Sequence, residues 1–391
     1  MRKLLTAAGG LAVAAIAATT MQAPALAQDT VKIGLIGAYT GQFADTMLMI
    51  DQGAKLYIKQ HGDTVAGKKI VLIPKDTGGP DAAKANQLAK ELVTRDGADI
   101  LAGFCLTPEA LGAASVSAQA KKFMVNMNAA TSMVITKSPY MVRTSVTLPM
   151  IASTMGKWAA TKGGVKKAYT MVADFGPGID AEKWFHKAFK ANGGEIVGSV
   201  RMALANPDFS AYVQAAKDKS PESIFMFVPG GAQPAALGKA FSERGIDPNK
   251  IKLLSTGEPV DDPALKALGD LALGRISAWH YDHNLPGKLN KDFVAAFNKD
   301  YGRNPDFFAM GGYDGMHVIY EALKKTGGKT DGESLVKAAK GLKWESPRGP
   351  IMIDPETRDV VQTVYIRKVE KVGGKLVNVA FDKYENVKDP K

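Results

Sequence analysis

Short apolar runs alternate with helical patterns along most of this chain. The first half shows apolar runs at 31–36, 70–73, 99–102 and 123–127, with helical patterns over 47–61, 81–95 and 108–121 between them. Apolar runs of four to six residues without polar alternation are typical of buried parallel strands. Helices between such strands predict right-handed crossovers and a doubly wound α/β sheet.

The same pattern then starts again without a long Pro- or Ser-rich linker. A helical pattern at 150–161 leads to apolar runs at 168–172, 196–200, 224–228 and 251–254, with helical patterns over 180–191, 209–217 and 232–244. Two doubly wound α/β lobes are therefore predicted.

The sequence after this second unit does not end where a second lobe should. An apolar run at 276–279 precedes two further helical patterns, 289–301 and 308–325. This continuation favours a return of the chain to the first lobe. The tail differs, because the runs 361–369 and 376–381 flank Gly373-Gly374 and predict an antiparallel hairpin.

The first residues have the pattern of a cleaved signal peptide over 1–27. Arg2 and Lys3 precede an apolar stretch at 4–16, and Ala25-Leu26-Ala27 supplies the small-x-small cleavage site. The stretch is shorter than the ~20 apolar residues of a membrane span. Cleavage leaves 391 − 27 = 364 residues, which favours two domains. We expect export to a bacterial periplasm.

The cysteine count and the charge narrow the class of protein. A single cysteine, Cys105, makes neither an internal disulfide nor a cysteine metal cluster, and its distance from the cleavage site argues against a lipid anchor. The net charge of +11 falls to +9 without Arg2 and Lys3. The lysines are scattered and form no basic run, so we expect no nucleic-acid partner.

Two motifs could suggest a cofactor or a metal. Gly176-Pro177-Gly178 opens a helix after a strand, but Pro177 removes an amide from the turn that would cradle a pyrophosphate. The stretch 280–283 holds two histidines without a third nearby, which favours a surface or hinge segment over a metal site. No nucleophile elbow or phosphate-binding loop is present, so we expect no cofactor and no enzyme activity.

Two segments at strand ends favour ligand binding. Thr107-Pro108-Glu109 begins a helix, and a helix start offers free amides to an anion, although Glu109 opposes one. Asn128-Ala129-Ala130-Thr131-Ser132 places hydroxyls after another strand. Both segments lie at carboxyl ends of strands, where open α/β sheets bind their ligands.

These segments also carry a family resemblance. The matching motifs are Val31-Lys32-Ile33-Gly34, Tyr39-Thr40-Gly41, Gly103-Phe104-Cys105, Asn128-Ala129-Ala130-Thr131, Gly257-Glu258, the stretch 305–313 and Arg348-Gly349-Pro350-Ile351. In order and spacing, the chain resembles the leucine/isoleucine/valine-binding proteins, type I periplasmic solute-binding proteins of ABC importers.

The resemblance implies two lobes joined by three hinge crossings near 144–147, 279–282 and 349–355. The N-terminal lobe would comprise 28–146 and 281–351, and the C-terminal lobe 147–280 and 352–391. The implied partners are a small carboxylate ligand and an inner-membrane ABC permease, and we expect a monomer.

The resemblance also implies roles for single residues. Thr131 would hold the ligand carboxylate, Ala129 would offer its carbonyl to an ammonium, and Glu258 would pair with that ammonium from the other lobe. Phe104, Cys105 and Phe308 would line the side-chain pocket, with Thr46 and Ala232 where relatives often carry bulkier groups.

Several departures from the family pattern leave the ligand open. Leu106 stands where amino-acid binders often use Ser, and Thr107 can substitute for it. Ala232 and the segment 175–178 replace aromatic-bearing segments, which predicts a larger pocket. Gly78-Gly79 stands where some relatives have a second cysteine, so Cys105 is expected to be a free thiol. We expect a small hydrophobic or aromatic carboxylate, in the first place a branched-chain or other amino acid. The alternative is an amine-free aromatic acid resembling benzoate. A ligand-sensing receptor domain is a further alternative.

Overall fold

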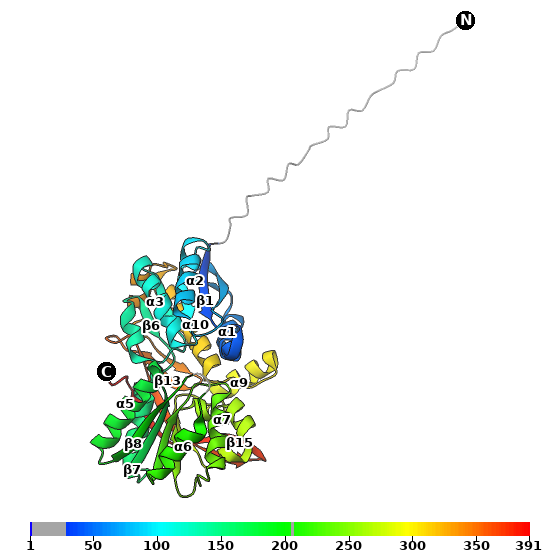
Figure 1. Ribbon diagram of the computed structural model, residues 1–391. Helices are drawn as coiled ribbons and strands as arrows, with labels where there is room; N and C mark the ends of the chain where they lie inside the picture. Colours follow the sequence, from blue (N-terminus) through cyan, green and yellow to red (C-terminus); the bar gives the residue numbers. More distant parts are fainter. Residues whose placement is uncertain (2–28, 205–206) are drawn as a thin grey trace.

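The structure is a computed structural model that describes Met1 and residues 29–204 and 207–391. Apart from Met1, the predicted signal peptide lies outside the described residues. Two α/β lobes are stacked one on the other, as the sequence pattern predicts (Figure 1). In the described part of the chain, no helix has the length and apolar character needed to cross a membrane.

The first lobe is built on a six-stranded sheet of order β2-β3-β1-β4-β5-β6, parallel except for the β2–β3 pair. Its strands are β1 (Thr30–Gly37), β2 (Thr64–Val65), β3 (Lys68–Asp76), β4 (Ile100–Gly103), β5 (Phe123–Asn126) and β6 (Met141–Arg143). Its early helices are α1 (Ala44–His61), α2 (Ala82–Thr94) and α3 (Thr107–Ala120). Pro74 does not end β3, because β2 pairs only with the first two residues of β3 and leaves a free edge beside the proline.

The second lobe holds a nine-stranded sheet of order β12-β13-β14-β11-β10-β9-β7-β8, with β15 paired to β14. Its parallel strands are β7 (Lys167–Ala173), β8 (Glu195–Met202), β9 (Ser223–Phe227), β10 (Lys252–Ser255) and β11 (Ile276–Trp279). Its helices are α4 (Leu148–Ala160), α5 (Gly176–Ala191), α6 (Phe209–Asp218), α7 (Gln233–Glu243) and α8 (Asp262–Leu268).

The predicted C-terminal hairpin is confirmed, as β14 (Val360–Val372) and β15 (Lys375–Val387) pair antiparallel. Gly373 and Gly374 join them with φ values of 56° and 80°. A two-residue hairpin with both φ values positive favours glycine at both positions.

The chain passes between the lobes three times. It leaves the first sheet after β6 and enters α4, and it returns after β11 through α9 (Lys288–Tyr301) to α10 (Phe307–Thr326) and α11 (Gly332–Ala339). α10 packs on α1, and α11 packs on α10 and β5. The last passage runs through β12 (Lys343–Ser346) and β13 (Gly349–Ile353). β13, which the resemblance divides between the lobes, is hydrogen-bonded to β12 and β14 of the second sheet.

Each crossing contains a buried pair of an arginine and an aspartate. The pairs are Arg143–Asp359 (3.1 Å), Arg367–Asp282 (3.0 Å) and Arg348–Asp314 (2.8 Å). Arg348 also donates to the carbonyl of Ser145, in the first crossing, at 3.1 Å. Loss of one partner from such a pair leaves a buried charge without compensation, so these pairs hold the crossings in one arrangement.

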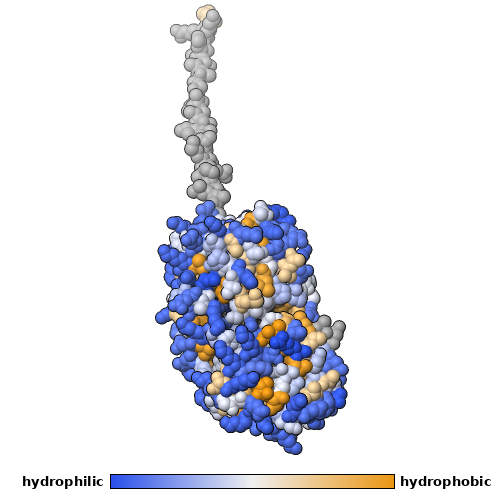
Figure 2. Space-filling view, turned by 60° about the vertical axis from the view of Figure 1, so that its left-hand side comes forward, coloured by the Kyte–Doolittle hydropathy of each residue, from blue (hydrophilic) through white to orange (hydrophobic). Residues whose placement is uncertain are grey.

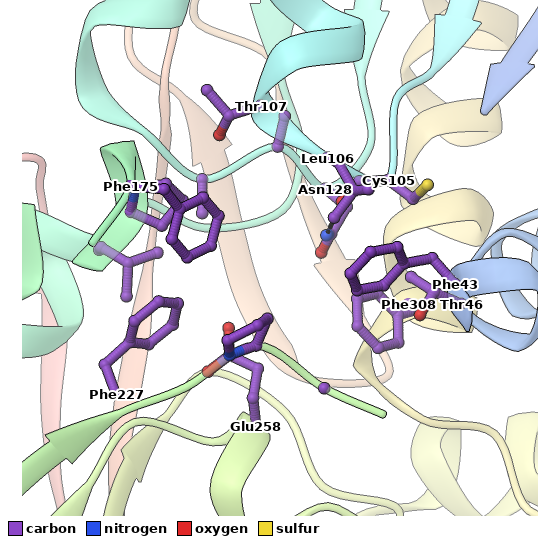
Figure 3. A pocket seen from close by; sticks show the side chains of 16 residues that line it. Phe43, Thr46, Cys105, Leu106, Thr107, Asn128, Phe175, Phe227, Glu258 and Phe308 are labelled. Atoms are coloured by element: carbon purple, nitrogen blue, oxygen red, sulfur yellow. Dashed lines mark hydrogen bonds between the residues drawn. The ribbon is translucent and has the colours of Figure 1, made fainter. Parts of the chain in front are cut away.

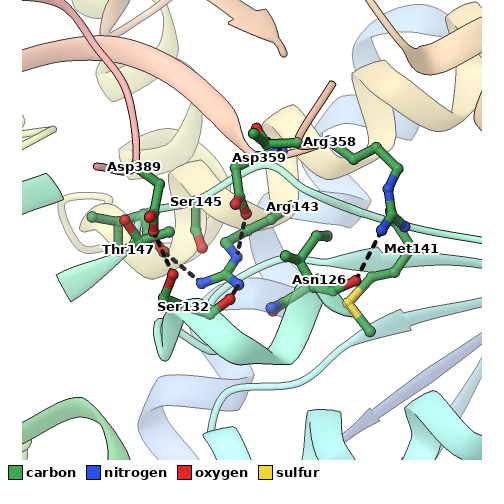
Figure 4. Close-up of polar contacts among 12 residues, drawn as sticks. Asn126, Ser132, Met141, Arg143, Ser145, Thr147, Arg358, Asp359 and Asp389 are labelled. Atoms are coloured by element: carbon green, nitrogen blue, oxygen red, sulfur yellow. Dashed lines mark hydrogen bonds and ion pairs between the residues drawn. The ribbon is translucent and has the colours of Figure 1, made fainter. Parts of the chain in front are cut away.

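The lobes also touch at the loop after β5 (Figure 4). The amide of Ser132 donates to Asp180 of α5 at 2.9 Å, and its hydroxyl donates to Asp389 of the C-terminal tail at 2.9 Å. A Cβ placed on Gly176 would lie 2.8 Å from Thr131 Oγ1. The two lobes are therefore closed on one another at this edge.

Polar residues predominate on the face of the molecule shown in Figure 2, and hydrophobic residues form small scattered patches there. The large apolar side chains are instead buried in clusters around the two sheets.

Candidate functional site

A cleft of about 470 Å³, counting the part open to solvent, lies between the lobes (Figure 3). The first lobe contributes Phe43, Thr46, Cys105, Leu106, Thr107, Asn128, Ala129, Ala130 and Phe308. The second lobe contributes Leu148, Phe175, Pro177, Phe227, Pro229, Gly230 and Glu258. A mostly apolar cleft between two lobes with a few polar groups is typical of a small-molecule site.

Aromatic rings form opposite walls of the cleft. Phe175 lies two residues after the end of β7, and Phe227 is the last residue of β9. Their ring centroids lie 5.9 Å apart, and the angle between the ring planes is 28°. Phe43 and Phe308 lie on the opposite side (Figure 3). No lysine or arginine of the described chain lines the cleft. The walls therefore suit a flat, hydrophobic group.

One end of the cleft carries hydroxyl groups and a helix start. Thr107 Oγ1 and Thr131 Oγ1 lie 2.9 Å apart. Gly176, the first residue of α5, faces Thr131 from the other lobe. No side chain caps this end of α5, and its first turn has no acidic residue. An uncapped helix start beside two hydroxyls offers hydrogen bonds and positive potential to an anion.

The start of α3, which the sequence also indicated for an anion, is already occupied. The carboxylate of Glu109 accepts from the amide of Leu106 (2.9 Å), the hydroxyl of Thr77 (2.8 Å) and the thiol of Cys105 (3.1 Å). Burial raises the pKa of Glu109. The helix start available to a ligand is therefore that of α5, because α3 binds its own carboxylate.

Cys105 is a free thiol, as expected from the sequence, and it is only 2% exposed. Burial, with Glu109 beside it, raises the pKa of this thiol well above its usual value. The thiol contributes to the wall of the cleft as a small, protonated group.

Glu258 lies at the opposite end of the cleft from Thr107 (Figure 3). It follows β10 in a short 3₁₀ turn and is 9% exposed. Its Oε2 atom is buried, and no described residue makes a hydrogen bond to it. Burial raises the pKa of Glu258 to about 7, although the Thr256 hydroxyl, the backbone amide of Glu258 and the Arg367 charge oppose this rise. A buried carboxylate oxygen without a donor is costly, so this end of the cleft suits a hydrogen-bond donor.

The structure places six of the nine residues singled out from the sequence in the lining of the cleft. These are Thr46, Cys105, Thr107, Ala129, Glu258 and Phe308. Thr131 is not among the lining residues, but its hydroxyl is hydrogen-bonded to that of the lining residue Thr107. The carbonyl of Ala129 already accepts from the side-chain amide of Asn126 at 2.8 Å.

Phe104 and Ala232 are not in the lining. The ring of Phe104 is fully buried in the cluster that also contains Ala85, Ala89 and Ala110, on the α2–α3 side of the sheet. Gly103 and Phe104 have positive φ values of 101° and 68°, so the chain turns at the end of β4, and Cys105 reaches the cleft while Phe104 does not. Ala232 caps α7, two residues beyond the cleft residue Gly230.

The sequence interpretation missed most of the aromatic wall. Segment 175–178 was expected to enlarge the pocket, but Phe175 itself supplies a ring, and Phe227 and Phe43 were not singled out. Phe175 and Phe227 each stand at the end of an apolar run. The rule that ligands bind at the carboxyl ends of parallel strands could have found both.

Two α/β lobes that close on a mostly apolar cleft define a two-lobed ligand-binding fold. Residues 30–375 match the family model described as periplasmic binding protein. The chain belongs to this family, whose members include solute-binding proteins of ABC transporters.

Relatives extend over nearly the whole chain. A Leu/Ile/Val-binding protein homolog 6 from Brucella melitensis is 39% identical over 384 residues, covering 97% of this chain and 98% of the relative. A solute-binding protein of an ABC transporter from Rhodopseudomonas palustris BisB5, in complex with 3,4-dihydroxybenzoic acid, is 51% identical. Its TM-score is 0.88, with 93% of this chain and 99% of that chain covered. One from strain HaA2, in complex with p-hydroxybenzoic acid, is 38% identical with a TM-score of 0.89 over 93% and 99% of the chains.

Proposed function

We propose that this protein is the periplasmic solute-binding component of an ABC importer and that its ligand is a small aromatic carboxylate of the benzoate class. The observation that carries the ligand class is the cleft itself, with four phenylalanine rings along its walls and two threonine hydroxyls at one end. The solved relatives that hold hydroxylated benzoic acids support the same class.

The ligand carboxylate would lie at the threonine end. Thr107 and Thr131 hydrogen-bond each other, so one of the two hydroxyls would donate to the carboxylate from the first lobe. The amides of Gly176 and Gly178 would donate from the second lobe, because Pro177 between them has no N–H. The ring would lie against Phe175 and Phe227, and aromatic pairs of this kind contribute about 0.5–1.5 kcal/mol each beyond burial. Because the donors come from both lobes, the ligand stabilises the closed form, and a permease would recognise that form.

A branched-chain amino acid is the second candidate, and the free oxygen of Glu258 favours it. An ammonium would donate to that oxygen and to the second lone pair of the Ala129 carbonyl. The two candidates differ in how they would contact the walls of the cleft. A flat aromatic ring can stack on the phenylalanine rings, and an aliphatic side chain cannot.

A thermal-shift and calorimetry panel separates the candidates. Ligand at about 100 times its Kd adds about 2.7 kcal/mol of stability. We expect benzoate, 4-hydroxybenzoate and 3,4-dihydroxybenzoate to raise the melting temperature, and leucine, isoleucine, valine and phenylalanine to leave it unchanged. Thr107→Val keeps the volume of the side chain and should weaken every aromatic acid. Shifts with the amino acids alone would contradict the proposal.

A further inference from the structure

We propose that Glu258 makes this cleft selective for aromatic acids that carry a hydroxyl group opposite the carboxylate. This inference rests on the proposed function and names the part of the ligand that the second lobe recognises. It assigns Glu258 to a neutral hydroxyl donor, whereas the family resemblance implies an ammonium.

The placement of Glu258 supplies the first argument. Thr107 and Glu258 occupy opposite ends of one cleft, and the walls between them are aromatic (Figure 3). A ring whose carboxylate reaches the threonine end therefore directs its opposite substituent toward Glu258. The carboxylate oxygen Oε2 is buried there, and no donor among the described residues meets it in hydrogen-bond geometry. The hydroxyl of Thr256, two residues earlier, lies close enough to lower the pKa of Glu258, but its Oγ1 also makes no hydrogen bond of good geometry within the described chain.

The neighbouring charges do not satisfy this oxygen. Arg367 of β14 donates to Asp282 and to the carbonyl of Tyr281, both at 3.0 Å, and to Ser277 at 3.2 Å. Its charge lowers the pKa of Glu258, but its hydrogen bonds go elsewhere. Asp261, the neighbouring carboxyl, caps α8 through the amide of Ala264 at 2.8 Å, and burial, with the Glu258 charge beside it, raises the pKa of Asp261 to about 7. The side-chain amide of Asn128, another cleft residue, donates to the carbonyl of Cys105 at 2.7 Å and therefore does not donate to Glu258.

The chemistry then separates hydroxylated from unsubstituted ligands. A ring hydroxyl donates to Oε2 and completes its hydrogen bonding, and a hydrogen bond to a charged acceptor is stronger than one between neutral groups. Benzoate closes the cleft over the same oxygen and leaves it unpaired. A buried acceptor of this kind should favour 4-hydroxybenzoate over benzoate by about 10- to 150-fold in Kd.

The two ligands should also respond to pH in opposite directions. A hydroxyl donor favours the ionised form of Glu258, so the affinity for 4-hydroxybenzoate rises as the pH increases through about 7. Benzoate removes water from Glu258 without replacing it and favours the protonated form, so its affinity falls over the same range. A packing preference for a larger ligand would produce no such divergence.

The test is titration calorimetry of the full mature chain with 4-hydroxybenzoate, 4-methoxybenzoate and benzoate from about pH 5.5 to 8. 4-Methoxybenzoate has the size of a substituted ring but no donor, so it should bind no more tightly than benzoate. Glu258→Gln keeps the shape and a neutral acceptor, and it should remove the opposite pH trends. Glu258→Leu removes the acceptor and should reduce the preference for the hydroxyl to less than about threefold while improving benzoate.

Asp270→Asn is the control, because Asp270 is an exposed carboxylate of the same lobe, with 68% of its side chain exposed. It should retain both the preference and the pH trends. If circular dichroism shows that Glu258→Leu does not fold, the Gln variant and the pH dependence of the wild-type affinities test the inference instead. The inference is overturned if benzoate and 4-hydroxybenzoate bind the wild type equally, or if 4-methoxybenzoate matches 4-hydroxybenzoate. Binding of none of the three acids would overturn the proposed function as well.

Discussion

Gly176→Ala should weaken ligand binding without weakening either lobe. Gly176 is the first residue of α5, and it does not have a positive φ. Alanine is a better helix former than glycine, so the second lobe alone gains or loses little stability. In the closed protein, however, the new Cβ would lie 2.8 Å from Thr131 Oγ1 and 3.4 Å from Thr131 Cγ2. The substitution therefore acts on lobe closure.

The size of the effect follows from this contact. An approach below 3.0 Å forces the neighbouring atoms to shift, and overpacking of this kind costs about 1–3 kcal/mol. If the cost falls only on the closed form, Kd increases by about 5- to 150-fold. The urea midpoint of the ligand-free protein should change little, because the open form has room for the methyl group.

A double-mutant cycle with Thr131→Ala tests the contact directly. Calorimetry with 4-hydroxybenzoate would measure Kd for the wild type, both single variants and the double variant. Thr131→Ala removes the hydroxyl and the methyl group that the new Cβ meets, so Gly176→Ala should have almost no further effect in that background. Equal effects of Gly176→Ala in both backgrounds would refute the proposed contact, as would an unchanged Kd in the wild-type background.

Three further predictions concern the hinge, the pH and the thiol. Asp314→Ala leaves Arg348 buried without its partner and should lower the free energy of unfolding in urea by about 3–5 kcal/mol. Asp270→Ala, at an exposed pair, should lower it by less than about 1 kcal/mol. Similar losses of stability for the two variants would contradict the hinge role of the Arg348–Asp314 pair. Burial raises the pKa of Asp306 to about 7 in the folded protein, whereas the ordinary value in the unfolded chain is near 3.8. Between these two pH values the folded protein keeps a proton on Asp306 that the unfolded chain has lost. Stability should therefore fall as the pH rises from about 4 to 7 and then level off, and Asp306→Asn should flatten this urea-midpoint profile; an unaltered slope would be the contrary result. Cys105 should react with a thiol-specific chromogenic disulfide far more slowly in the native protein than in urea, because it is 2% exposed and burial raises its pKa; comparable rates would exclude a buried thiol.

Apolar runs located the long elements of the fold, and the elements that were missed are short or unusual. β6 has only three residues, and α11 has eight and begins at a glycine. β12 and β13 carry the last passage between the lobes and are partly exposed, so they lack a continuous apolar run. Burial on both faces makes a strand recognisable in a sequence, and β12 and β13 do not have it, whereas β6 is buried but too short.

The candidate site could be predicted to the level of segments but not of side-chain directions. The strand ends that contain Cys105, Thr107 and Ala129 all contribute to the cleft. Phe104 was expected there as well, but its positive φ of 68° in the turn after β4 directs its ring into the apolar cluster beside α2 and α3. The aromatic wall was missed because Phe175 and Phe227 come together only when β7 and β9 pair in the sheet.

The identity of the ligand is harder to predict than its place, since one acidic residue can serve two chemistries. A glutamate opposite a carboxylate site accepts equally from an ammonium or from a phenolic hydroxyl, and the sequence around Glu258 is the same in both cases. The surroundings separate the two. An ammonium needs a compensating negative charge and further acceptors, and the Ala129 carbonyl already accepts one hydrogen bond. A neutral hydroxyl needs one free acceptor and an aromatic slot that leads to it, and the cleft contains both. The choice of ligand therefore follows from how the rest of the lining is bonded, which only the folded arrangement reveals.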